Sequence, residues 1–410
     1  MRRISLDKRR RRPVVAALAV AVVAGAIVWA VSANAGSSHE PAAFARHGVL
    51  KVSHVRKLGA LEAPRDSLAG GELIQDHGAR RARLGGGDEV IAALTGSLVP
   101  VAVESSDRSL VAYSSWHQIA QIKPDEPGQG VRVGDPIGVP SVRLYDATTG
   151  KDTLVASGAY SPALAESGEL AFVKGDETIV RQNRPYNGQI VVGTAGRGPF
   201  TPWTSDAARY FTYGWAGHRL LAYRQLPDSE AMDLYAFSGA QQARLLAAGA
   251  TVVALSPDGK RFVATIGRRM IEIVRVADGG VESSLALDGP GIAPPGSTST
   301  PHALMYSGSW FGDRVVANSD AGLIVLNTKD GLRIESVFTT PFPHGIIEPT
   351  FTDETHVIGW ADLKAVPVGK HAEPAFDHAL VSCDLAAAAC VAGPAQPARA
   401  WTRWVTNPSR

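Results

Sequence analysis

The chain has 410 residues, of which 45% are hydrophobic and 20% charged, and its formal net charge is +2. Residues 1–13 carry seven basic side chains and one acidic one, so the remainder of the chain has a net charge of about −4. That balance argues against a nucleic-acid-binding surface, which needs clustered Lys and Arg. The 42 Gly and 26 Pro residues favour many tight turns over long helices.

The N-terminal residues predict a membrane segment. A basic cytoplasmic stretch, residues 1–13, precedes the uncharged apolar run 14–31, whose length is close to the roughly 20 residues that cross a bilayer. Basic residues keep their end of a span in the cytoplasm, so the chain after residue 31 is expected to be extracytoplasmic and anchored by one span in the cell membrane. The small-residue pattern Ala33-x-Ala35 leaves an alternative open, in which signal peptidase cleaves after Ala35 and the protein is secreted.

Residues 32–87 are expected to form a tether and linker, because their first part is poor in β-branched residues. This range contains the basic cluster Arg80, Arg81 and Arg83, followed by three glycines. We interpret the cluster as a solvated loop, and contact with an anionic envelope polymer is the alternative.

Residues 88–410 repeat one pattern, in which a strand, a polar turn and a strand are followed by a second hairpin. The clearest turn is Ser256-Pro257-Asp258-Gly259, because Ser suits the first position, Pro presets φ at the second, and Asp and Gly fit the last two. Comparable first hairpins are predicted in 103–115, 163–175, 203–215, 307–319 and 349–361. The interpretation is an all-β fold, a β-propeller of six to seven four-stranded blades, since radial stacking covers both faces of each small sheet. A seventh blade would combine residues 88–98 with the C-terminal segment 398–407.

The segment LSPDGKRFVA, residues 255–264, resembles the repeat signature of the TolB-like, or WD40-like, β-propellers of the bacterial cell envelope. The match is sharp in this unit and diluted in the others. The resemblance implies a scaffold whose shallow central funnel receives a peptide or a partner protein.

Cys383 and Cys390, the two cysteines of the chain, flank a short turn between two predicted strands. In an oxidising compartment they are expected to form a disulfide that joins this hairpin. A search for chemistry predicts no catalytic, cofactor-binding or metal-binding residue. The local cluster His371, Glu373, Asp377 and His378 is interpreted as a solvated polar loop, with a metal site as the alternative.

Tryptophans recur near the ends of the predicted strands, where the rims of a propeller lie. Exposed aromatic side chains at such places can anchor a partner, whereas most aromatic side chains of this fold pack between blades. The residues considered as rim contacts are Trp116, Trp203, Trp215, Trp310 and Trp360.

Two functions are therefore compared. The first is a membrane-tethered extracytoplasmic propeller that acts as a non-catalytic scaffold and binds an envelope protein or peptide. The second is a propeller enzyme of the lactonase, glycosidase or quinone-dehydrogenase kind, whose axial site would collect side chains from several blades and leave no local motif.

Overall fold

The computed structural model describes residues 55–61, 72–75, 80–84, 89–90, 98–116, 118–122, 132–137, 139–175, 187–206, 208–225, 232–267, 270–286, 305–319, 322–342, 345–366 and 375–395. The chain divides into two units, Met1–His47 and Gly48–Arg410, and every described residue belongs to the second. The described residues include no helix, and therefore none long and apolar enough to cross a bilayer. The predicted membrane segment 14–31 lies outside the described residues.

Six sheets each contain four antiparallel strands that pair in chain order, which confirms the all-β interpretation. Blade 1 contains β6 (Leu98–Glu104), β7 (Leu110–Trp116), β10 (Ser141–Asp146) and β11 (Lys151–Ser157). Blade 2 contains β12 (Ala159–Leu164), β13 (Glu169–Gly175), β14 (Gly188–Thr194) and β15 (Thr201–Pro202). Blade 3 contains β16 (Arg209–Ala216), β17 (Arg219–Gln225), β18 (Met232–Phe237) and β19 (Ala243–Ala247).

The second half of the chain continues the series. Blade 4 contains β20 (Ala250–Leu255), β21 (Arg261–Ile266), β22 (Met270–Arg275) and β23 (Val281–Ala286). Blade 5 contains β24 (Met305–Phe311), β25 (Arg314–Ser319), β26 (Gly322–Asn327) and β27 (Arg333–Thr339). Blade 6 contains β28 (Ile346–Phe351), β29 (His356–Val366), β30 (Ala375–Asp384) and β31 (Ala389–Ala392). A separate hairpin, β8 (Gln118–Ile122) and β9 (Arg132–Ile137), is inserted between the second and third strands of blade 1.

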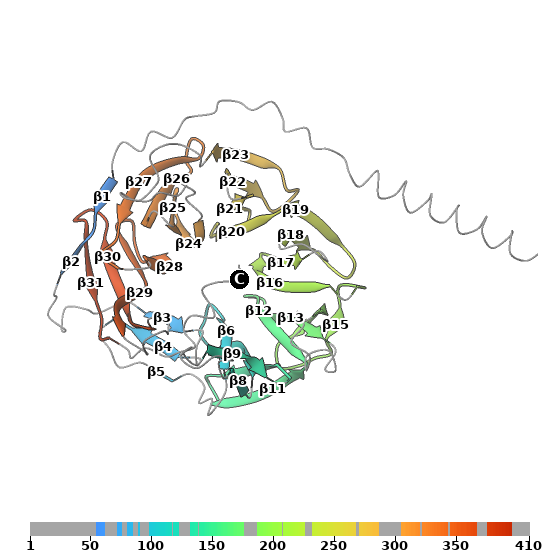
Figure 1. Cartoon of the computed structure of the whole chain (residues 1–410). Coiled ribbons are helices and arrows are strands. Elements are labelled where there is room, and N and C mark those ends of the chain that lie inside the picture. Colours follow the sequence, from blue (N-terminus) through green and yellow to red (C-terminus); the bar gives the residue numbers. More distant parts are fainter. Residues whose placement is uncertain are drawn as a thin grey trace, which may run out of the picture. The chain divides into compact units, whose positions relative to one another are not determined.

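The apolar core lies between the blades. Among the described residues, five buried clusters each join two consecutive blades, from blades 1 and 2 to blades 5 and 6. Each cluster contains side chains that alternate along the middle strands, such as the fully buried Phe172 and Phe262. The sheets therefore stack side by side as β-propeller blades, with the first strand of each blade towards the centre of the ring (Figure 1).

A three-stranded sheet from the N-terminal part of this unit lies between blade 6 and blade 1. It contains β3 (Glu72–Gln75), β4 (Arg80–Arg83) and β5 (Glu89–Val90). Leu84 packs on Leu380 of blade 6, and β3 contacts β6 of blade 1. The predicted C-terminal partner of a seventh blade, residues 398–407, lies outside the described residues.

The range that we expected to be a tether thus contributes strands to the propeller. β4 includes Arg80, Arg81 and Arg83, so this basic cluster is part of a strand and not a loop. In the register of the sheet, Arg83 lies opposite Glu72 and Arg81 opposite Glu89.

Two further strands cover the outer edges of two blades. We call Val55–Leu61 the N-terminal strap; it contains β1 (Val55–Lys57), which pairs in parallel with β27, and β2 (Gly59–Leu61), which pairs in parallel with β31 (Figure 1). Between them the Leu58 N–H donates to Thr339 O at 2.9 Å, and the Leu58 side chain is fully buried. The strap therefore joins the outer strands of blades 5 and 6.

One predicted hairpin was placed in the wrong register. The segment 203–215 was expected to hold the first turn of blade 3, but Ser205 and Asp206 connect blade 2 to β16. The first turn of blade 3 is Gly217-His218, where Gly217 has φ +60°. Ser and Asp favour a turn within a blade as much as a turn between two blades, so these residue types do not show which turn they form. Only the pairing of the strands distinguishes the two turns.

Candidate functional site at the centre of the ring

The innermost strand of every four-stranded blade contains a β-bulge. The pairing with the second strand shifts register in β6, β12, β16, β20, β24 and β28. A bulge inserts a residue that the partner strand does not match, and it turns side chains away from the regular alternation of the strand. The centre of the ring is therefore lined by irregular backbone from all six blades.

Two of these bulges hold a non-glycine residue at positive φ, immediately before a proline. Ser161, before Pro162, has φ +52°, and Glu348, before Pro349, has φ +53°. Few residues other than glycine adopt this region, because the Cβ atom crowds the backbone. Such conformations tend to occur at functional sites, where the surrounding structure holds them in place.

Hydrogen bonds from a neighbouring blade hold both bulges. The Thr212 N–H of blade 3 donates to Ser161 Oγ of blade 2 at 3.1 Å. The Glu348 N–H of blade 6 donates to Ser307 Oγ of blade 5 at 3.3 Å, and the Phe351 N–H donates to Ser309 Oγ at 2.7 Å. The packing of neighbouring blades therefore fixes the geometry at the centre of the ring.

Two bulge residues present exposed side chains. Tyr213 is 37% exposed, and its ring centre lies 6.2 Å from that of Tyr223 in an edge-to-face contact. Glu348 is also exposed. The surrounding protein partly desolvates both groups, which raises the pKa of Tyr213 to about 12 and raises the pKa of Glu348 above its ordinary value. A phenol and a carboxyl group that solvent reaches in crowded surroundings can bind a polar group of a ligand.

Sequence reasoning did not find Tyr213 or Glu348. A usable signal was present, because proline inside a predicted inner strand indicates a bulge or an edge. Pro100, Pro162 and Pro349 all fall in inner strands. Tyr213 carries no such signal, and its bulge is visible only in the pairing of β16 with β17.

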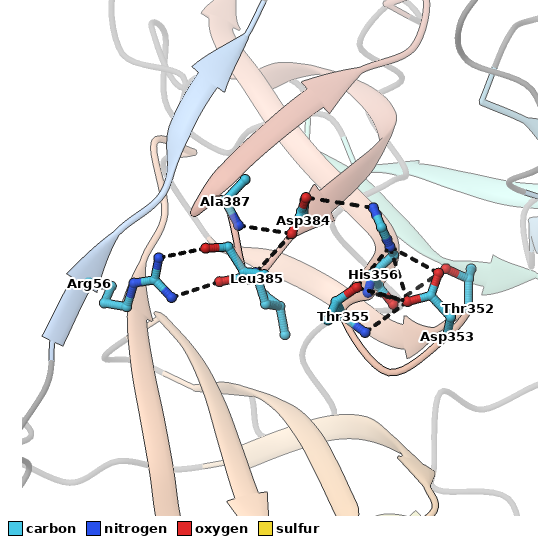
Figure 2. A network of polar contacts seen from close by, with 9 residues as sticks. Arg56, Thr352, Asp353, Thr355, His356, Asp384, Leu385 and Ala387 are labelled. Atoms are coloured by element: carbon cyan, nitrogen blue, oxygen red, sulfur yellow. Dashed lines mark hydrogen bonds and ion pairs between the residues drawn. The ribbon is translucent and has the colours of Figure 1, made fainter.

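The opposite end of blade 6 carries a second polar cluster. His356 begins β29, and its Nδ1 atom lies 2.9 Å from Asp353 Oδ2 in the preceding turn (Figure 2). Its Nε2 atom lies 3.8 Å from Asp384 Oδ2 at the end of β30. The imidazole therefore bridges the two turns at this end of the blade.

This cluster continues to the N-terminal strap. The N–H groups of Ala386 and Ala387 donate to Asp384 Oδ1. Arg56 of the strap donates to the carbonyls of Leu385 and Ala386 at 2.9 and 2.8 Å (Figure 2). The network therefore links the first turn of blade 6, its last turn and the strap.

The position of His356 in the repeat indicates a structural role. It is the first residue of the second strand, a position that blades 3, 4 and 5 fill with arginine. Arg219 donates to Val276 O of the next blade at 3.1 Å. The guanidinium carbon of Arg261 lies 5.1 Å from the ring centre of Trp310, and that of Arg314 lies 5.8 Å from that of Phe351, each in the next blade. His356 instead joins two turns of its own blade, and we interpret the cluster as packing of the last blade.

The turn aspartates give a prediction for acid titration. The backbone N–H of Thr355 and the His356 side chain lower the pKa of Asp353 to about 2, and hydrogen bonds from Ser105 and Ser109 lower that of Asp107 to about 2. Because both values are lower than the ordinary 3.8, each carboxylate stabilises the fold above about pH 4, and this stabilisation is lost as the pH falls through about 2. NMR titration of the carboxyl carbons should give both midpoints near 2, and midpoints near 3.8 would contradict these hydrogen bonds.

The residues of the predicted repeat turn lie between β20 and β21. The Gly259 N–H donates to Ser256 O at 2.8 Å, and Gly259 has φ +65°. Ser256 Oγ donates to Asp258 Oδ1 at 2.7 Å, and Pro257 is exposed. These contacts are local to the turn. Its role is therefore to join β20 to β21, as its composition indicates.

Two tryptophans considered as rim contacts pack between blades 2 and 3. Trp203 and Trp215 meet edge to face with ring centres 5.9 Å apart, and both contact the buried cluster of these blades. Trp215 Nε1 donates to Ala163 O at 3.1 Å. Both rings therefore contribute to the interface between the two blades.

The other tryptophans differ in their surroundings. Trp310 is only 7% exposed and lies beneath Arg261, so its ring faces protein. Trp360 is half-buried, with its ring centre 5.8 Å from that of His378. The side chain of Trp116, at the end of β7, lies outside the described residues.

The predicted disulfide is confirmed. Cys383 and Cys390 lie opposite each other on β30 and β31 and are bonded, with an S–S distance of 2.03 Å. Both are buried in the cluster between blades 5 and 6, which also contains Leu58. His371 and Glu373 lie outside the described residues, within which no group of three or more His, Cys, Asp or Glu side chains could hold a metal ion.

Comparisons with known proteins find similarity only to solved structures, at low sequence identity. No family model and no curated protein matches the chain. Among solved structures, TolB from Acinetobacter baumannii is similar at 15% identity and a TM-score of 0.36, with 63% of this chain and 60% of the TolB chain covered. A chain of the mitotic checkpoint complex is similar at 11% identity and a TM-score of 0.46, with 77% of this chain and 92% of that chain covered.

An acylaminoacyl peptidase from Pyrococcus horikoshii is similar at 12% identity and a TM-score of 0.44, with 73% of this chain and 46% of that chain covered. The matched region thus spans less than two thirds of both the TolB and the peptidase chains. The propeller assignment rests on the six repeated sheets of the chain itself.

Proposed function

We propose that this protein is a membrane-tethered, extracytoplasmic β-propeller that acts as a non-catalytic scaffold in the cell envelope and binds a protein or peptide partner at the centre of its ring. The observation that carries the proposal is the exposure of Tyr213 and Glu348 on bulged inner strands. Neighbouring blades hold these bulges, so a partner would meet a preformed surface, which lowers the entropic cost of binding.

The location outside the cytoplasm is supported by two independent features. The basic stretch 1–13 and the apolar run 14–31 are typical of a segment that directs the export of the chain after it. The disulfide in blade 6 is typical of proteins that fold in an oxidising compartment. The apolar run would either remain as a single membrane span or be removed after Ala35.

The chemistry at the centre suits a partner with polar and cationic groups. A tyrosine combines a large apolar ring with a hydroxyl, and such residues often dominate binding energy at interfaces. A carboxylate in crowded surroundings gains most from a partner that supplies a hydrogen-bond donor or a positive charge. We therefore expect Tyr213 and Glu348 to contribute most to retention of the partner.

The test is retention of an envelope protein by the full chain, purified in detergent and mixed with envelope extract. Tyr213→Ala and Glu348→Gln should each reduce retention about tenfold, a typical effect of removing an interface anchor. Phe311→Ala is the matched control, because Phe311 is 39% exposed but ends β24 at the turn side of the blade.

Metal analysis of the same purified protein separates this function from the alternative of a propeller enzyme. A specific partner whose retention depends on Tyr213 supports the scaffold. A stoichiometric bound metal ion, together with retention that neither substitution changes, would contradict the scaffold and favour an enzyme.

A further inference from the structure

The inner strand of blade 5 directs two serine hydroxyls at blade 6. Ser307 and Ser309 are two residues apart on β24, and alternate residues of a strand share one face. At Gly308, between them, a Cβ atom would overlap Val316 O of β25, so no side chain fits there. Both hydroxyls form hydrogen bonds with β28, the strand that carries Glu348.

These serines accept hydrogen bonds from the bulge in β28. Glu348 and Pro349 have no partner on β29, because the register of the two strands shifts there. The Glu348 N–H donates instead to Ser307 Oγ at 3.3 Å, and the Phe351 N–H donates to Ser309 Oγ at 2.7 Å. An N–H group that loses its acceptor inside a protein costs free energy. The two serines therefore stabilise this conformation of the bulge.

The second strand of blade 6 leaves room for the same bulge. A Cβ atom at Gly359 of β29 would lie 2.8 Å from Ile347 O and 3.4 Å from Pro349 Cα. A glycine inside a strand is typical of a place where another backbone approaches closely. Blade 6 therefore supplies the space for the bulge, and blade 5 supplies the hydrogen bonds that fix it.

The backbone of the bulge decides where the Glu348 carboxylate lies. None of the described residues forms a hydrogen bond or an ion pair with this carboxylate. Its position instead follows from the φ of +53° at Glu348, which an ordinary strand residue does not adopt. A change in this backbone would displace the carboxylate, and a displacement of about 1 Å is enough to weaken a preformed site.

We propose that Ser307 and Ser309 are positioning residues for the binding site at the centre of the ring. Their hydroxyls fix the bulge that presents the Glu348 carboxylate to a partner, and they act through this backbone without touching the partner. The proposal rests on the function proposed above, since it assigns residues of blade 5 to a site whose carboxylate belongs to blade 6.

The first test is the titration of Glu348 in the full chain in detergent. Glutamate labelled with carbon-13 at the side-chain carboxyl reports each midpoint by NMR, and the Glu348 signal is the one that Glu348→Gln removes. The wild-type midpoint should lie above the ordinary 4.5, because Glu348 is partly desolvated. The double variant Ser307→Ala and Ser309→Ala should have a lower midpoint, closer to 4.5, because a relaxed bulge gives the carboxylate more water.

The second test is retention of the envelope partner by the same double variant. Loss of correct positioning should reduce retention about fivefold, the equivalent of about one net hydrogen bond. If the double variant does not fold, Ser307→Ala alone removes the acceptor of the Glu348 N–H and serves both tests.

Ser161→Ala is the matched control for a merely structural role. Ser161 Oγ accepts from the Thr212 N–H at 3.1 Å, so this variant removes a similar bond between blades 2 and 3. It should lower the thermal unfolding temperature as the blade 5 variants do and leave the Glu348 midpoint at its wild-type value. A role in blade packing alone would lower the unfolding temperature in every variant and change the Glu348 midpoint in none.

Three results would overturn the positioning role. The first is a Glu348 midpoint that the double variant leaves unchanged. The second is an equal change of that midpoint in Ser161→Ala. The third is undiminished retention by the double variant where Glu348→Gln does reduce retention. A changed midpoint together with retention that Glu348→Gln leaves intact would instead contradict the proposed function, and the effect of the serines on Glu348 would stand.

Discussion

Replacing Leu58 by alanine is expected to lower the free energy of unfolding by about 3 kcal/mol, the usual cost of a fully buried leucine. Leu58 is 0% exposed and belongs to the cluster that joins blades 5 and 6. The strap around it has few other ways to hold its place, because β1 and β2 each contain three residues. Loss of the Leu58 side chain therefore weakens both parallel pairings as well as the cluster.

Lys57→Ala is the matched control, since the neighbouring Lys57 is exposed and should change stability by no more than about 0.5 kcal/mol. Urea unfolding followed by tryptophan fluorescence measures both variants against the wild type. Equal midpoints for Leu58→Ala and the wild type would contradict the burial of the strap. Hydrogen exchange should also be faster in β27 and β31 of Leu58→Ala, because those strands lose their outer cover.

Removal of the disulfide, by the double substitution Cys383→Ala and Cys390→Ala, is expected to cost about 2 to 3 kcal/mol. The two cysteines are seven residues apart, so the bond closes a short loop and restricts the unfolded chain only modestly. Both side chains are buried beside Leu58, and the loss of their packing adds to the effect. The unfolding midpoint of blade 6 should therefore fall.

Addition of a reductant provides the control for this prediction. Reductant should lower the thermal unfolding temperature of the wild-type protein, whose disulfide becomes accessible as the last blade opens, and leave that of the double variant unchanged. A wild-type unfolding temperature that does not respond to reductant, together with an unchanged midpoint of the double variant, would contradict the stabilising role of the bond.

Local sequence patterns were sufficient to predict most of the blades. The turn at Ser256-Pro257-Asp258-Gly259 is encoded by the φ preferences of its own residues, which act over four positions. Patterns of this kind succeed because hairpin strands pair with their sequence neighbours.

The strap, by contrast, could not be predicted, because it pairs with strands that are distant in the sequence. Its side chains meet residues more than 300 positions away, as when Arg56 donates to Leu385 O and Ala386 O. Nothing in the seven residues VRKLGAL indicates which edges they cover, and a segment of this length outside a sheet is typical of a linker. The same limit applies to β3, β4 and β5, which lie between the first and last blades.

The candidate site at the centre could not be predicted from the sequence either, for a different reason. Glu348 and Tyr213 come from blades 6 and 3, and their exposure depends on bulges whose position is set by pairing between strands. The prolines marked some of these bulges but did not show which side chains they would expose. A repeat pattern describes what the blades share, whereas a binding site depends on where individual blades depart from the repeat.

The sequence by itself thus determined the repeated four-stranded unit, its turns, the disulfide pair and an apolar run long enough to cross a bilayer, because each is encoded by residues that are close together in the chain. Only the tertiary structure decided the register of blade 3, the covering of blades 5 and 6 by the strap, and the side chains exposed at the centre. These features arise from contacts between distant segments, and the energy that selects them appears only when the blades pack against one another.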